Sequence, residues 1–349
     1  MELLSCCMDK DITARVKSFA VEDKRRTHLE TWPTLLALLI NGYCLVRSAY
    51  PLLSLFLSLL QALLIVRIFV IYHDSQHGAI FRKSFFPKQV MKLVGLILLA
   101  PEGIWKRSHN YHHASNGKVP VSGAGSYPVV SSEQYLRMNF LSRLVYKANR
   151  HYLTIFLGYF TVFIFWLNVK SCLQSPRKHI DSSLSLLCHF GFSWLIFKCF
   201  GLQVYFLLCF FPFLLAFGIG SYLFYCQHNF PGAVFYSGKN WSYAQSAIHS
   251  TSYLQTNRWM RWFTANIGYH TVHHINAKVP FYTLPKVMDE IQGLKNDYPI
   301  SLGLKDIVSC LKLKLWDEKR QSMITWKEFD AIYGERTAIS LDDNAASKL

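Results

Sequence analysis

Charged residues, and acidic residues above all, are scarce in this sequence. Only 17% of its 349 residues are charged, with 21 Asp and Glu against 37 Lys and Arg, whereas soluble chains carry roughly 25%. Hydrophobic residues make up 51% and the mean hydropathy is +0.16, so the composition argues against a soluble protein and indicates a membrane protein. The net charge of +16 is then better explained by anionic lipid headgroups and by orientation in a bilayer than by nucleic acid.

Several other signals are absent as well. The nine Cys are scattered, mostly in apolar segments and without C-x-x-C spacing, which favours small buried residues over disulfides or zinc ligands. Residues 1–30 contain no compact apolar stretch followed by a cleavage site of small residues, so no cleaved signal peptide is expected. The sequence has no low-complexity segment and no internal repeat longer than a short histidine pattern.

Long apolar segments are present instead. About 20 apolar residues cross the hydrocarbon core as a helix, and four such segments form two pairs with a short turn inside each pair: residues 32–46 with 50–72, and residues 182–200 with 203–225. These pairs predict two transmembrane hairpins, or about four spanning helices. The apolar patch 90–104 is expected to be interfacial or re-entrant, and the aromatic-rich segment 152–169 to lie in the interface. The predicted fold is an all-α integral membrane protein.

Basic residues predict the orientation of these hairpins. Residues 106–150 hold the densest basic group near the spans, and residues 1–31 are polar and basic. By the positive-inside rule this face and both termini are cytoplasmic. Arg67 lies inside the second apolar segment, where its side chain could snorkel to the surface or pair with an acid.

Histidines gather at four places on the predicted cytoplasmic face. The pattern His-x-x-His-His occurs twice, a shorter cluster follows the second apolar segment, and one further histidine stands alone; the nine are His73, His77, His109, His112, His113, His228, His270, His273 and His274. Positions i, i+3 and i+4 share one face of a helix, so three imidazoles can converge on one point. A zinc hydrolase needs three or four ligands, so eight or nine imidazoles indicate two metal ions. Two redox-active irons could activate O2 and remove hydrogen from an unactivated methylene, which no side chain does unaided.

The order of these clusters around two membrane hairpins resembles the integral-membrane fatty acid desaturase family. The resemblance covers about residues 30–330. Within the family, the sequence is most similar to bacterial acyl-lipid desaturases of the delta-12/omega-6 type. It also rests on motifs outside the histidine clusters: residues 227–230, Trp241, Ser252 and Tyr253, Trp259, residues 266–269 and residues 279–282.

The resemblance implies both a ligand set and a reaction. It implies that the nine histidines are ligands of two irons. It also implies that the reaction is the O2-dependent introduction of a cis double bond into a lipid-linked acyl chain. No His-Pro-Gly-Gly haem motif occurs, so electrons are expected from a separate ferredoxin, or from cytochrome b5 with its reductase. Asp74 and Asn266, next to the first and third clusters, are candidates for orienting imidazoles.

The resemblance also implies a division of the chain and a location. We expect a cytoplasmic N-terminal segment (1–31), a membrane desaturase domain with a histidine-rich cap (32–335) and a flexible C-terminal tail (336–349). The host membrane would be a bacterial inner membrane or, in a eukaryote, the endoplasmic reticulum.

Two other functions fit parts of this pattern. A hydroxylase or ketolase acting on an alkyl, sterol-like or carotenoid substrate would share the first hydrogen abstraction, and sequence does not separate it from a desaturase. A metal transporter or a histidine-rich sensor would need ionisable residues along the spans. The spans contain little beyond Arg67, Asn41, Gln61 and His189, which argues against transport.

Overall fold

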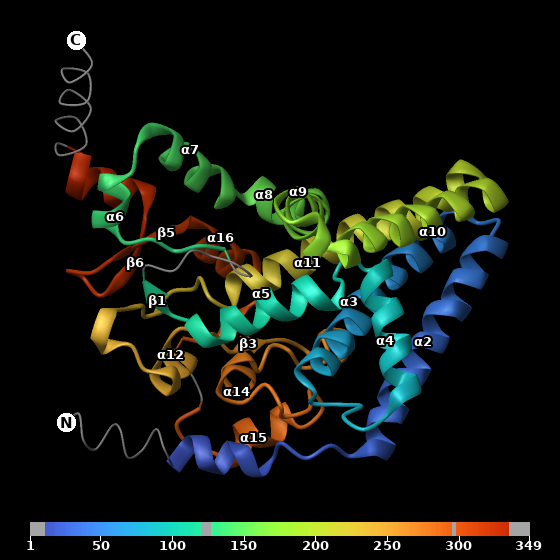
Figure 1. Cartoon of the computed structure of the whole chain (residues 1–349), viewed down its shortest axis with the longest axis horizontal. Coiled ribbons are helices and arrows are strands. Elements are labelled where there is room, and N and C mark those ends of the chain that lie inside the picture. The colour runs from blue at the N-terminus through green and yellow to red at the C-terminus, as the bar shows by residue number, and fades with distance from the viewer. Residues whose placement is uncertain (1–10, 120–126, 295–297, 335–349) are drawn as a thin grey trace.

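The computed structural model describes residues 11–119, 127–294 and 298–334. The tail predicted for residues 336–349 lies outside the described residues, and the domain division remains a prediction. Helices dominate the described chain, as the sequence predicts, and its few strands form three small two-stranded sheets. Figure 1 shows the long helices on the right and the shorter elements of the cap on the left.

Two helices form the first hairpin. Helix α2 (Lys24–Arg47) begins within the predicted N-terminal segment, because the side chain of Asp23 accepts a hydrogen bond from Arg26 N and caps the helix there. Helix α3 (Pro51–His77) starts with proline at its first position and ends at Gly78, whose φ of 67° is left-handed. Both helices are long and apolar enough to span a membrane.

The third candidate span, Ile180–Cys226, folds back on itself to form the second hairpin. Its elements are α10 (Ile180–Tyr205), η3 (Phe206–Phe210) and α11 (Phe211–Cys226). Gly201 breaks α10 with φ 81° and ψ 177°, a conformation that other residues rarely adopt. The turns of both hairpins lie at the same end of the molecule (Figure 1), and Ser58 Oγ donates to Leu207 O at 2.5 Å near that end. The predicted pair of hairpins is confirmed.

Helix α4 (Phe85–Ile97) is too short to span and ends inside the protein. A helix end leaves carbonyl groups without partners, which is costly away from water. Here side chains from other helices donate to four carbonyls at and just after the end of α4. Ser185 donates to Leu96 O, His189 Nδ1 to Ile97 O, Asn168 to Leu99 O and Tyr72 to Ala100 O. Its neighbours therefore satisfy the end of α4 inside the protein, and its placement as an interfacial or re-entrant helix stays a prediction.

The segment predicted to lie in the interface forms short helices that pack on the second hairpin. Residues 152–169 form α8 (Tyr152–Phe156) and the π-helix η1 (Tyr159–Val169), and α9 (Lys170–Gln174) and η2 (Pro176–Lys178) follow them. Tyr159, Phe163 and Leu167 of η1 are buried in the main core, and no residue of this segment belongs to a candidate span among the described residues.

The cap is built from short elements between and after the hairpins. Its helices are α5 (Glu102–Ser115), α6 (Ser132–Arg137), α7 (Phe140–Asn149), α12 (Tyr243–His249), α13 (Arg258–Phe263), α14 (His270–Ile275), α15 (Leu284–Glu290), α16 (Leu304–Lys312) and the turn η4 (Gly238–Asn240). Strands β1 (Lys118–Val119) and β2 (Tyr236–Ser237) pair in parallel, as do β3 (Leu254–Gln255) and β4 (Ile300–Ser301), while β5 (Leu313–Asp317) and β6 (Ser322–Thr325) form an antiparallel hairpin. Helices α3, α5 and α14 meet where the cap joins the spans (Figure 1).

Candidate metal centre

The nine histidines predicted from the sequence lie together in the structure, in two groups. His73 and His77 occupy the last turns of α3, and His228 follows α11 directly. Helices α5 and α14 each carry one His-x-x-His-His pattern on a buried face. The other described histidines belong to neither group.

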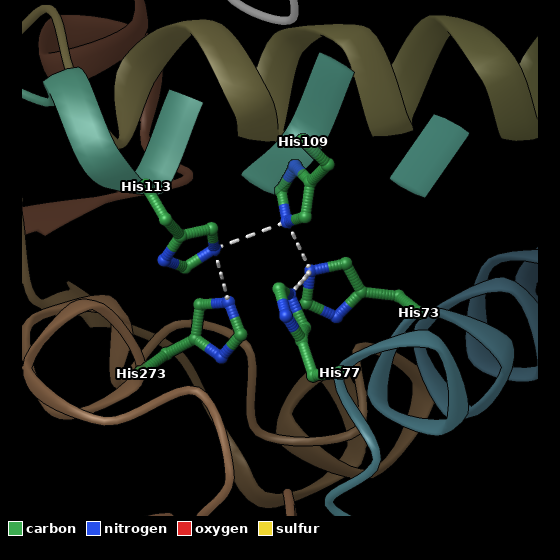
Figure 2. Close-up of side chains that lie close together, drawn as sticks. All are labelled: His73, His77, His109, His113 and His273. Carbon is green, nitrogen blue, oxygen red and sulfur yellow. Dashed lines mark hydrogen bonds between the residues drawn. The ribbon is translucent and has the colours of Figure 1, made fainter. Parts of the chain in front are cut away.

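The first group holds five imidazoles, those of His73, His77, His109, His113 and His273 (Figure 2). The facing Nε2 atoms are 2.7 Å apart between His73 and His109, 3.2 Å between His73 and His77, and 3.1 Å between His109 and His113. His273 Nε2 lies 3.1 Å from His113 Nε2. All the candidate ligand atoms of the group lie within 4.8 Å of one another.

The second group holds four imidazoles, those of His112, His228, His270 and His274. His228 Nε2 lies 3.0 Å from His112 Nε2 and 2.9 Å from His270 Nε2. Its other nitrogen, Nδ1, donates to Ser250 O at 3.2 Å, which points Nε2 into the group. All four side chains are buried.

The two groups divide each histidine pattern in the same way. Every i, i+4 pair stays together: His73 with His77, and His109 with His113, in the first group, and His270 with His274 in the second. Each i+3 histidine, His112 or His273, joins the other group. Neighbouring residues on a helix are rotated by about 100° around the helix axis. The last two histidines of each pattern therefore point in different directions. The expectation that three imidazoles of one pattern converge on a single point is therefore wrong.

This arrangement fits metal ions better than hydrogen bonds. His109 Nε2 faces both His73 Nε2 and His113 Nε2, and a neutral imidazole has one N–H, which can serve only one of them. His274 Nε2 is buried without a hydrogen-bond partner among the described residues. A cation at the centre of each group would accept these lone pairs together.

Burial keeps the imidazoles neutral, which metal binding requires. Desolvation, together with the neighbouring histidines, lowers the pKa of His109, His112 and His113 well below the ordinary value. The same causes act on the pKa of the histidines of α14, and desolvation lowers the pKa of His228 to about 4. At neutral pH the ring nitrogens are thus free to bind a cation.

The approach of α14 to the rest of the cap depends on a glycine. Gly268 O accepts from Leu254 N at 2.9 Å, and a Cβ at Gly268 would lie 2.7 Å from Leu254 O. Any larger residue would push the two segments apart. Gly268 therefore holds the start of α14, with His270, against β3.

The two residues predicted to orient imidazoles are placed differently. Asp74 is fully buried, with Oδ1 3.4 Å from His73 Nδ1 and Oδ2 accepting from Phe281 N at 2.7 Å. It stands where an orienting carboxylate would stand. Asn266 instead donates to Phe281 O at 3.2 Å. Both side chains hold the backbone of Phe281, but only Asp74 lies beside an imidazole.

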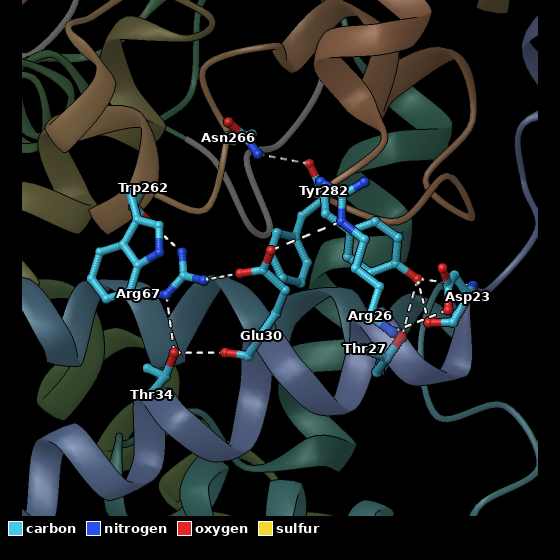
Figure 3. Close-up of polar contacts among 10 residues, drawn as sticks. Asp23, Arg26, Thr27, Glu30, Thr34, Arg67, Trp262, Asn266 and Tyr282 are labelled. Carbon is cyan, nitrogen blue, oxygen red and sulfur yellow. Dashed lines mark hydrogen bonds and ion pairs between the residues drawn. The ribbon is translucent and has the colours of Figure 1, made fainter.

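Arg67 pairs with an acid and does not snorkel. Its side chain is 2% exposed and its guanidinium contacts Glu30 Oε2 at 2.5 Å (Figure 3). It also donates to Thr34 Oγ1 at 3.0 Å and to the carbonyl of Trp262, whose ring lies 4.0 Å from the guanidinium carbon. Arg67 thereby ties both helices of the first hairpin to α13, a short distance before the third histidine pattern.

Sequence reasoning missed two aromatic residues of the site. The ring of Trp105 stacks on His109 with centroids 5.3 Å apart and planes 17° apart. Phe224 lies 5.1 Å from His112 and 6.1 Å from His228 between ring centroids. Trp105 precedes His109 by one helical turn, the i, i+4 spacing that places two side chains in contact. Phe224 precedes His228 by the same spacing, but it stands among other apolar residues in the sequence, which hide this signal.

Comparisons with known proteins identify the family of this chain. The sequence model of the family described as "Fatty acid desaturase" matches residues 48–301. A protein named "Fatty acid desaturase" from Bacillus subtilis is 29% identical over 322 residues, which cover 91% of each chain. An "sn-1 acyl-lipid omega-3 desaturase (ferredoxin)" from Nostoc sp. is 25% identical over 69% of this chain and 67% of its own. An "sn-1 oleoyl-lipid 12-desaturase" from Synechocystis sp. is 24% identical over 62% of each.

Proposed function

The chain belongs to the fatty acid desaturase family, whose members are oxidoreductases, and on this premise we propose that it introduces a cis double bond into a lipid-linked acyl chain in an O2-dependent reaction at two histidine-bound irons. The observation that carries the proposal is the division of nine imidazoles, eight of them buried and that of His77 partly buried, into groups of five and four. Each group offers enough nitrogen ligands for one metal ion.

Iron is the metal that joins these ligands to the family's reaction. Imidazole suits zinc, copper, iron and nickel alike, but desaturation removes electrons and hydrogen from the substrate, so the metal must be redox-active. When bound, the two irons would supply the O2-dependent oxidation of an unactivated methylene that no side chain performs.

The chain's own residues would hold the reaction centre in place and keep it dry. Helices α5 and α14 each contribute to both groups, so together they would hold two bound metal ions in a fixed relation. Trp105 and Phe224 place aromatic walls against the imidazoles, and the carboxylate of Asp74, 3.4 Å from His73 Nδ1, would orient that ring. Such rigid surroundings position an apolar chain and exclude water from the reacting carbon.

The electrons would come from a separate protein. Two cyanobacterial relatives carry "ferredoxin" in their names, which supports a ferredoxin as the donor, with cytochrome b5 and its reductase as the other candidate. The location proposed for the enzyme is a bacterial inner membrane or the endoplasmic reticulum, with several spans and with the metal centre and both termini on the cytoplasmic side. Three helices of spanning length and character support the membrane location.

The test is a lipid analysis of cells that express the wild type or His273→Ala. We expect a new unsaturated acyl chain with the wild type, located by mass spectrometry, and its disappearance with the variant. His249→Ala is the matched control, because His249 is exposed and belongs to neither group; it should leave the product unchanged. If hydroxylated lipid appears in place of the unsaturated chain, the reaction assigned to the protein would be hydroxylation instead of desaturation. No new lipid, with a ferredoxin and its reductase co-expressed, would refute the proposal.

A further inference from the structure

A cavity of about 580 Å³ opens on the surface beside the first histidine group. Its walls come from the end of α3, from α4, from α5 and from the loop after α14. Five basic side chains line it against one acid, and these six are Arg82, Lys88, Lys92, Lys106, Lys278 and Glu102. We call this cavity the basic pocket. Its composition suits an anion.

The charge of the pocket is largely uncompensated. Glu102 pairs with Lys92 at 3.1 Å. Among the described residues, Lys88, Lys106 and Lys278 form no ion pair with a carboxylate. These three lysines come from α4, from α5 and from the loop after α14, so an anion between them would bind three separate elements at once. Lysine ammonium groups are common ligands of phosphate.

The pocket reaches the metal centre. His77 lines it and is the one histidine of the two groups that is not fully buried. Gln76 lines it too, is 8% exposed, and its side-chain oxygen has no hydrogen-bond partner among the described residues. A ligand that carries a phosphate would satisfy the three lysines together.

Exposed aromatic residues lie at the start of α4, the helix that contributes Lys88 and Lys92 to the basic pocket. Phe85 and Phe86, in the first turn of α4, are 79% and 68% exposed, and Lys88 follows within one turn. Aromatic and basic residues side by side are typical of the boundary between hydrocarbon and headgroups. An anion that enters here comes most readily from a lipid.

We propose that the basic pocket binds the phosphate headgroup of the phospholipid whose acyl chain is the substrate. This inference rests on the proposed function and adds the class of acyl carrier, a glycerophospholipid. A small-molecule site is a concavity of roughly 300–1,000 Å³, and the volume of the basic pocket falls in that range. A docked protein would instead cover a broad surface of about 800 Å² on each partner.

The test measures binding without turnover, on the iron-loaded protein in a neutral detergent and without an electron donor. The variant Lys88→Gln/Lys106→Gln/Lys278→Gln removes the three unpaired charges. The control variant Lys305→Gln/Lys312→Gln/Lys327→Gln removes three exposed lysines elsewhere. The probe is dihexanoyl-phosphatidylglycerol, followed by calorimetry, with inorganic phosphate and dihexanoylglycerol as competitors.

We expect the pocket variant to bind the probe at least tenfold more weakly and the control to stay within twofold of the wild type. Inorganic phosphate should compete weakly and the neutral dihexanoylglycerol hardly at all. Unchanged iron content and melting temperature would show that the variant is folded. Unchanged probe affinity in the pocket variant would overturn the proposal. A variant that loses affinity for ferredoxin but not for the probe would also overturn it, because the pocket would then be a docking site for the electron donor. Because no turnover is needed, failure of desaturation would leave this test intact.

Discussion

The imidazoles of His113 and His274 stack with ring centroids 4.1 Å apart and planes 16° apart, although each belongs to a different histidine group. The two rings form the boundary between the groups, one contributed by α5 and the other by α14. A displacement of either helix would therefore disturb both sets of ligands. The structure holds the two candidate metal positions as one unit.

Metal binding should be cooperative across this boundary. We expect His113→Ala and His274→Ala each to reduce the iron content from two per chain to well below one, because removing either ring lets both helices move. Plasma mass spectrometry of the purified proteins measures the ratio, with His249→Ala as the control. Retention of one iron per chain in either variant would show that the two positions fill independently.

Asp74→Asn should weaken metal binding while the protein stays folded. An amide oxygen can still accept from Phe281 N, but an amide NH2 group, which only donates, then replaces the carboxylate oxygen beside His73 Nδ1. Residues that orient a metal ligand typically change metal affinity or activity by about 10- to 100-fold. We expect a loss of iron to a competing chelator that is faster by about that factor. Equal rates of iron loss in the variant and the wild type would assign Asp74 only a structural role, through its bond to Phe281.

Glu30→Gln should destabilise the junction between the first hairpin and α13. Removing one partner of a buried ion pair leaves an uncompensated charge, which costs about 3–5 kcal/mol in a fully buried site. Since the side chain of Glu30 is 26% exposed, solvent screening reduces the cost to about 2–3 kcal/mol. The measurement is the thermal unfolding of the protein in detergent.

A neighbouring pair provides the control for this change. Arg26 lies 3.9 Å from the same Glu30 carboxylate, and its side chain is 53% exposed. Arg26→Gln should cost only about 0.5 kcal/mol, the usual size for an exposed helical pair. Equal effects of Arg26→Gln and Glu30→Gln would contradict the special role of Arg67.

The metal-free protein should lose stability in mild acid. Burial lowers the pKa of His228 from 6.5 to about 4, and it lowers the pKa of the α14 histidines well below the ordinary value. Between about pH 6.5 and pH 4 the unfolded chain therefore binds protons that the folded chain does not, so stability falls as the pH drops through this range.

Unfolding of chelator-treated protein at several pH values checks this expectation. The midpoint should be lower at about pH 5 than at about pH 7.5. His228→Phe should show a shallower dependence on pH, because one titrating group is removed. A midpoint that stays constant over this range would mean that the imidazoles are solvated in the metal-free state.

The sequence by itself determined the all-α membrane fold and the candidate ligand residues. Apolar length predicts each hairpin, with a short turn between the two apolar segments of each pair. Histidines at i, i+3 and i+4 identify the candidate site, because residues with that spacing lie close together on any α-helix. These are local properties, which depend on residues close together in the chain.

The tertiary structure alone decided how distant residues combine. The sequence allowed the Arg67 side chain either to extend to the surface or to pair with an acid. The outcome depended on Glu30, which lies on another helix and pairs with Arg67 inside the protein. The division of each histidine pattern between two groups depended on the relative rotation of α3, α5 and α14, and no single helix determines that rotation. The basic pocket likewise joins lysines from three elements. Packing of the helices sets these contacts, because side-chain interactions act over a few ångströms in space whatever the separation along the chain.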